Sequence, residues 1–137
     1  MAILLDASIV VAAADRSDLH HEAAAAWFGR ASEPLLIGAL TLGEVDLVLE
    51  RALGPAATAA VVASILGGSV RLVAPTQADL ARALELCAEA AEHRPRLADA
   101  ILVATAERLH VRRIGTVDRR PIAVFRPRHV RGFDLEP

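Results

Sequence analysis

The sequence contains no lysine and no tyrosine, and it has a single cysteine among its 137 residues. With no second cysteine the chain cannot form an internal disulfide, which fits a reducing cytoplasm. The apolar neighbours of Cys87 favour a core position on a helix. All 15 basic residues are arginine, and a biased genomic base composition explains this more simply than selection for function.

The sequence also lacks a long uninterrupted hydrophobic run. Although 54% of the residues are hydrophobic, charged residues, Gly or Pro interrupt each apolar stretch well before the roughly 20 residues that a membrane-spanning helix needs. The first apolar run, which starts at Ala2, already ends at Asp6, and we therefore expect no signal peptide. The length and composition predict one soluble, cytoplasmic domain over residues 1–137 with a substantial core.

Charge is unevenly distributed along the chain. Residues 1–93 carry 5 arginines and 12 acidic residues, a net charge of −7, whereas residues 94–137 carry 10 arginines and 5 acidic residues, a net charge of +5. An arginine-rich end combined with acidic residues elsewhere suits a protein that meets phosphate backbones.

Segments with strand and helix patterns alternate along the chain. We predict strands at 2–5, 35–38, 70–73 and 111–114, with a further candidate at 123–125. We predict helices at 8–14, 19–30, 41–53, 55–66, 76–92 and 98–109. This order indicates an α/β domain with a central, mainly parallel sheet of four to five strands flanked by helices. In such sheets, functional groups collect beyond the carboxyl ends of the strands.

Four acidic residues are placed where they could converge on that edge: Asp6, Glu44, Asp99 and Asp118. Asp6 follows the first strand, and Asp118 follows the strand at 111–114. Glu44 and Asp99 lie in the first turns of predicted helices. We therefore treat these four carboxylates as candidate metal ligands.

Three of these acids also have an ordinary structural explanation. Thr41 and Glu44 match a capping box, in which both side chains satisfy free backbone N–H groups at a helix start. Asp99 would be favoured near a helix start by the helix dipole, and Asp118 is typical of a polar turn. Asp46 is a second choice to Glu44, although its position two residues later turns it to another face of the helix.

Asp6 carries the strongest physical case for a bound cation. It ends an apolar strand, where a charge is at least partly buried and costly without a partner. The nearest basic residue, Arg16, lies beyond the next predicted helix, so a divalent cation is the economical partner. Carboxylate oxygens favour Mg²⁺ or Mn²⁺, which would acidify a bound water and stabilise charge during phosphodiester hydrolysis. Ser8 and Thr116, each two residues from an acid, could orient a ligand or a water.

Four motifs occur in a specific order, and together they resemble the PIN domain family, most of all the VapC ribonuclease toxins of toxin–antitoxin pairs. The motifs are Asp6-Ala7-Ser8, Thr41-Leu42-Gly43-Glu44, Leu97-Ala98-Asp99-Ala100-Ile101 and Thr116-Val117-Asp118-Arg119. The resemblance spans nearly the whole chain. One departure is Arg119-Arg120-Pro121-Ile122, where relatives often continue with Arg-Asp-Phe. No auxiliary acid is therefore expected there, and Asp118 is the only candidate in that turn.

The resemblance implies a parallel-sheet α/β domain with Mg²⁺- or Mn²⁺-dependent endoribonuclease activity on RNA. It also implies a homodimer that is inhibited by a small antitoxin protein whose C-terminal segment wraps the toxin. The residues that match the acidic positions of the family are Asp6, Glu44, Asp99 and Asp118, and those that match its supporting hydroxyls are Ser8 and Thr116.

Other functions remain open at this stage. One is a PIN-like module that binds RNA or a protein without efficient catalysis. Another is an aspartate-dependent phosphatase or a receiver domain, but the phosphatase pattern needs a second aspartate where Ser8 stands, and both classes generally need a lysine. The apolar helices at 41–67 would supply a groove for an antitoxin helix, or they could be core and dimer interface.

Overall fold

Five parallel strands form one sheet, in the spatial order β3-β2-β1-β4-β5. The structure is a computed structural model, and it describes residues 1–137. The strands are β1 (Ile3–Leu5), β2 (Leu35–Gly38), β3 (Val70–Val73), β4 (Arg113–Gly115) and β5 (Asp134–Glu136). The predicted α/β class and the parallel sheet are therefore confirmed, and the sheet has the larger of the two expected strand numbers.

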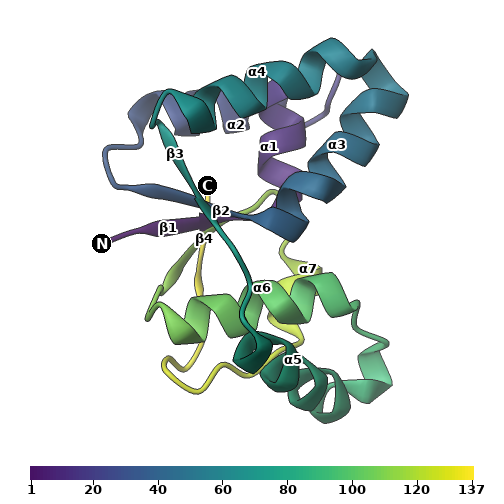
Figure 1. Cartoon of the computed structure of the whole chain (residues 1–137), viewed down its shortest axis with the longest axis vertical. Coiled ribbons are helices and arrows are strands. Elements are labelled where there is room, and N and C mark those ends of the chain that lie inside the picture. Colours follow the sequence, from purple (N-terminus) through teal and green to yellow (C-terminus); the bar gives the residue numbers. More distant parts are fainter.

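Helices cover both faces of this sheet. They are α1 (Ala7–Ala14), α2 (His21–Arg30), α3 (Ala39–Leu53), α4 (Pro55–Leu66), α5 (Gln77–Glu89), α6 (Leu97–Arg108) and α7 (Arg120–Ala123), with a short 3-10 helix at Ala91–His93. Figure 1 shows α1 to α4 on one side of the sheet and α5 to α7 on the other. None of the helices combines the length and the apolar composition needed to cross a membrane.

The central strand β1 separates two hydrophobic cores. Leu4 packs into the core beneath α5 and α6, whereas Ile3 and Leu5 pack into the core beneath α1 to α3. All three residues are buried, as expected for the alternating side chains of a parallel strand that is covered on both faces. Because both sides of β1 are packed, the position of Asp6 directly after it is well defined.

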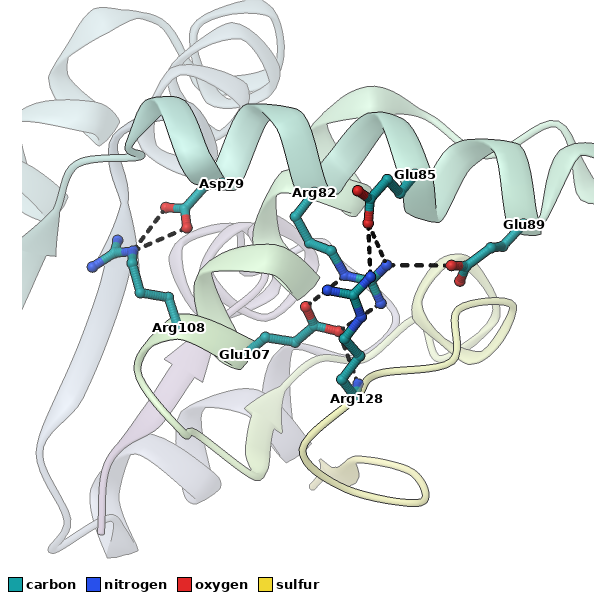
Figure 2. A network of polar contacts seen from close by, with 7 residues as sticks. All are labelled: Asp79, Arg82, Glu85, Glu89, Glu107, Arg108 and Arg128. Carbon is teal, nitrogen blue, oxygen red and sulfur yellow. Dashed lines mark hydrogen bonds and ion pairs between the residues drawn. The ribbon is translucent and has the colours of Figure 1, made fainter.

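The core beneath α5 and α6 is reinforced by a network of arginines and carboxylates, which Figure 2 shows. Arg82 Nε on α5 donates to Glu107 Oε2 on α6 at 2.8 Å, and Arg108 Nε on α6 donates to Asp79 Oδ1 on α5 at 2.9 Å. The backbone N–H of Arg128 donates to Glu107 Oε1 at 2.9 Å. The network therefore joins the two helices and holds the C-terminal segment against them.

The predicted strand at 123–125 is wrong. Residues Arg120–Ala123 form α7, with Pro121 in its first turn, where its missing N–H and fixed φ favour a helix. The last strand is β5, which begins eleven residues after the end of α7 and pairs with the free edge of β4. Arg113 on β4 forms an ion pair with Glu136 on β5. This ion pair stabilises β5 although its acidic residues are uncommon in strands.

The proposed capping box at Thr41 and Glu44 is also wrong. The helix α3 starts two residues earlier, at Ala39, and no side chain caps it. Thr41 is buried, and Glu44 lies in the second turn, too far along the helix to reach the free N–H groups at its start. The structure instead has a capping box at the start of α5, formed by Thr76 and Asp79. The capping explanation for Glu44 is thereby removed.

Candidate functional site

Asp6 lies at the carboxyl end of β1, where it caps the N-terminus of α1. Its Oδ2 accepts hydrogen bonds from the Ser8 N–H at 3.4 Å and from Ser8 Oγ at 2.6 Å. Thr116 Oγ1, beyond the end of β4, lies 2.9 Å from the same oxygen. All of these contacts use Oδ2, so the carboxylate is held in one orientation while Oδ1 remains available to a ligand.

The two hydroxyls that contact Asp6 also connect it to the turn that carries Asp118. Ser8 Oγ accepts from the Val117 N–H at 3.1 Å, and Thr116 Oγ1 accepts from the Asp118 N–H at 3.1 Å. Asp118 is therefore fixed beside Asp6 through its backbone. Its carboxylate is half-exposed and lies 3.6 Å from Nε of the highly exposed Arg120.

Glu44 and Asp99 come together because α3 and α6 start next to each other. The first turn of α3 and the beginning of α6 line the same small crevice. Arg96, the residue before α6, bridges the two carboxylates. Its Nε donates to Asp99 Oδ2 at 2.9 Å, and its Nη2 donates to Asp99 Oδ1 at 3.1 Å and to Glu44 Oε2 at 3.2 Å. One guanidinium nitrogen is thus shared by both carboxylates.

The electrostatic environment of Glu44 connects three of the four acids. Burial raises the pKa of Glu44, and the nearby charges of Asp99 and Asp6 raise it further, while Arg96 opposes them without reversing the result. Ionisation of Glu44 is therefore less favourable in the folded protein than in water. A further positive charge placed among these carboxylates would be favourable.

The four predicted acids occupy one edge of the sheet, but they do not form a single cluster. No three side chains of His, Cys, Asp or Glu converge closely enough to hold a metal ion as they stand. Glu44 and Asp99 instead share the guanidinium of Arg96. Asp6 contacts hydroxyl groups, and the side chain of Asp118 is half-exposed.

These residues nevertheless suit Mg²⁺ or Mn²⁺. Such ions take oxygen donors, and Mg²⁺ commonly uses only one or two carboxylates together with waters and substrate phosphate. A cation already lies between Glu44 and Asp99 in the form of the Arg96 side chain, which shows that positive charge is favoured at this position.

Sequence reasoning did not identify Arg96. The available signal was its position three residues before Asp99 at a helix start, a spacing that allows an ion pair on one helix face. The expectation that no nearby arginine pairs with Asp6 agrees with the structure, in which hydroxyl and backbone donors contact its carboxylate. Asp46, the second choice, lies exposed on α3.

Comparison with known proteins gives a consistent result. Residues 3–126 match the family model described as PIN domain. The chain is similar to Ribonuclease VapC26 of Mycobacterium tuberculosis, with 26% identity over 125 residues, covering 91% of this chain and 93% of the relative.

Two solved structures illustrate the shared fold. The toxin VapC20 of Mycobacterium tuberculosis, described as cleaving the sarcin–ricin loop, superposes with a TM-score of 0.83 at 24% identity, over 94% of this chain and 98% of that one. A chain of the VapBC2 complex of Rickettsia felis, bound to a DNA fragment from its promoter, gives a TM-score of 0.70 at 13% identity, over 99% and 98% of the two chains. Because the family model spans most of the sequence, the chain belongs to the PIN domain family.

Proposed function

We propose that this chain is a divalent-metal-dependent endoribonuclease and the toxin of a toxin–antitoxin pair. The observation that carries the proposal is the Glu44–Asp99 pair, which is held around a cation beside Asp6 at the carboxyl edge of a PIN-domain sheet. The similarity to a relative described as a ribonuclease supports RNA as the substrate class.

The residues that would hold Mg²⁺ or Mn²⁺ are Asp6, Glu44, Asp99 and Asp118. When bound, such an ion makes a coordinated water more acidic and stabilises negative charge that develops on the phosphodiester. Ser8 and Thr116 would keep the carboxylate of Asp6 in a fixed orientation, because both contact its Oδ2. A fixed ligand lowers the reorganisation needed when the ion and the RNA arrive.

Basic residues beside Asp118 would bind the RNA backbone. His20, Arg119 and Arg120 line an open hollow of about 530 Å³ together with Val117 and Asp118. Guanidinium groups bind phosphate oxygens through charge-assisted hydrogen bonds. A strand lying in this hollow would have its phosphates next to the acidic edge.

A separate apolar groove is suited to the antitoxin. It has a volume of about 590 Å³, and hydrophobic side chains of α1, α2, α4 and β2 line most of it. Of the helices expected at 41–67, only α4 contributes, through residues such as Val61. An amphipathic helix of a small antitoxin would bury its apolar face here.

The variant Val61→Asp tests this groove, because it places a charge among its apolar side chains. It should abolish co-purification with the product of a neighbouring small gene and leave RNA cleavage by the free toxin unchanged.

The variant Asp6→Asn tests the catalytic proposal. Asparagine still caps a helix, so the fold should remain, but the loss of a charged ligand should reduce cleavage of a single-stranded RNA by about 100-fold or more. Asp46→Asn is the matched control, because it makes the same change at an exposed position of α3 and should cleave like the parent. If Asp6→Asn cleaved as fast as the parent, in preparations free of contaminating nuclease, the proposed centre would be wrong.

A further inference from the structure

Arg96 lies between Glu44 and Asp99, where an ion held by both carboxylates would also lie. It lies just before α6 and contacts Asp99 through two nitrogens, while the same side chain reaches Glu44 on α3. An inference drawn from this position rests on the proposed function, because it assumes that these two carboxylates are metal ligands.

The burial of the three side chains differs sharply. The Asp99 side chain is 5% exposed and that of Glu44 is 28% exposed, whereas that of Arg96 is 63% exposed. The guanidinium therefore lies at the mouth of the site with the carboxylates beneath it. A long side chain in this position can move into solvent without disturbing the core.

Arg96 brings a single positive charge to two carboxylates, because its guanidinium contacts both Glu44 and Asp99. A divalent ion would provide twice the charge of Arg96 at the same carboxylates.

We propose that Arg96 is a positioning residue that holds Glu44 and Asp99 together in the metal-free protein and is displaced from both when Mg²⁺ or Mn²⁺ binds. The guanidinium contacts both carboxylate oxygens of Asp99 and Oε2 of Glu44, so an ion held by the same oxygens would compete with it. Metal binding then includes the free energy of breaking the Arg96 contacts, and the apparent affinity for metal is lower than that of the bare carboxylates.

The affinity for Mn²⁺, measured by calorimetry on the full chain, tests this competition. Arg96→Gln should bind Mn²⁺ about three- to tenfold more tightly than the parent, the range expected from losing two partly exposed ion pairs. Arg94→Gln is the matched control. Arg94 is exposed, lies two residues earlier and forms no ion pair, so the same charge change there should leave the affinity unchanged.

A second measurement follows the arginine directly in the unaltered protein. The Nε–H group of Arg96 donates to Asp99, and its NMR signal can be assigned through the side-chain carbons. Titration with Mg²⁺ should shift this signal towards the position of a solvent-exposed arginine, in step with metal binding. This readout remains decisive even if Arg96→Gln fails to fold.

The outcomes separate the inference from the proposed function. The competition is supported if Arg96→Gln binds Mn²⁺ more tightly while Arg94→Gln binds like the parent. A Mg²⁺-dependent shift of the Arg96 signal supports it as well. If the parent binds Mn²⁺ but Arg96→Gln binds no more tightly and the Arg96 signal does not move, the competition is overturned while the metal site stands. If neither the parent nor Arg96→Gln binds Mn²⁺, both proposals are overturned.

Discussion

Two groups of acidic side chains in this molecule differ in the arginines that contact them. The network between α5 and α6 contains Asp79, Glu85, Glu89 and Glu107, and three arginines contact them, as Figure 2 shows. The candidate site also contains four acids, but Arg96 bridges only two of them, and Asp118 lies 3.6 Å from a highly exposed arginine. The contacts of Asp6 are with hydroxyl and backbone donors. Both groups consist of Asp and Glu, but arginines contact every acid of the network and leave Asp6 at the site without such a contact.

The pKa values follow this difference. Burial opposes ionisation of Asp79 and Glu107, but contacts with Arg108 and Arg82, respectively, outweigh it and hold both pKa values below their ordinary range. Burial raises the pKa of Glu44, and Arg96 does not reverse the effect. The arginines of the network therefore stabilise its carboxylates, whereas Glu44 at the site keeps an unfavourable charge that a bound cation can relieve.

The largest effect on stability should come from removing the central arginine of the network. Arg82→Met keeps the apolar stem but leaves the nearly buried carboxylate of Glu107 without its main partner, and should cost about 2–4 kcal/mol in the free energy of unfolding. Urea denaturation measures this loss. Arg128→Met is the control, because that exposed side chain pairs only with Glu85 and should cost no more than about 0.5 kcal/mol. Equal losses in the two variants would contradict the structural role assigned to Arg82.

A second prediction concerns acid. Because the pKa values of Asp79 and Glu107 are lowered by folding, the stability they contribute is present above the unfolded pKa of about 4 and is lost as pH falls through the folded values. Asp79→Asn should therefore be less stable than the parent at pH 6, by about 1–3 kcal/mol. The gap should close as both proteins are titrated towards pH 2. A gap that is independent of pH would show that the charge of Asp79 is not the cause.

The smallest effect should have the opposite sign. A raised pKa means that folding favours neutral Glu44, so its contribution is present at low pH and is lost as pH rises through the raised folded value. Glu44→Gln mimics the neutral form and should leave the melting temperature unchanged or raise it by about 1–2 °C. The same variant should weaken Mn²⁺ binding. Glu107→Gln is the contrasting control, and should lower the melting temperature. If Glu44→Gln clearly lowered the melting temperature, the charge of Glu44 would stabilise the fold, as the charges of Asp79 and Glu107 do, and the prediction would be wrong.

Much of the architecture was predictable from local pattern. The strands at Leu35–Gly38 and Val70–Val73 have the predicted bounds, because short apolar runs between Gly, Pro and polar residues leave few alternatives. The short C-terminal elements were not predictable. Two of the three residues of β5 are acidic, and the strand forms because β4 offers a free edge and Arg113 pairs with Glu136.

The sequence is enough to name the four acids of the site, their order along an α/β chain and their positions near strand ends and helix starts. Their partners depend on the tertiary fold, which supplies hydroxyl and backbone donors to Asp6 and brings Arg96 between Glu44 and Asp99. The physical reason is separation along the chain. Thr116 lies 110 residues from Asp6, and Arg96 lies 52 residues from Glu44, so packing of the sheet and helices, and no local pattern, brings these groups together.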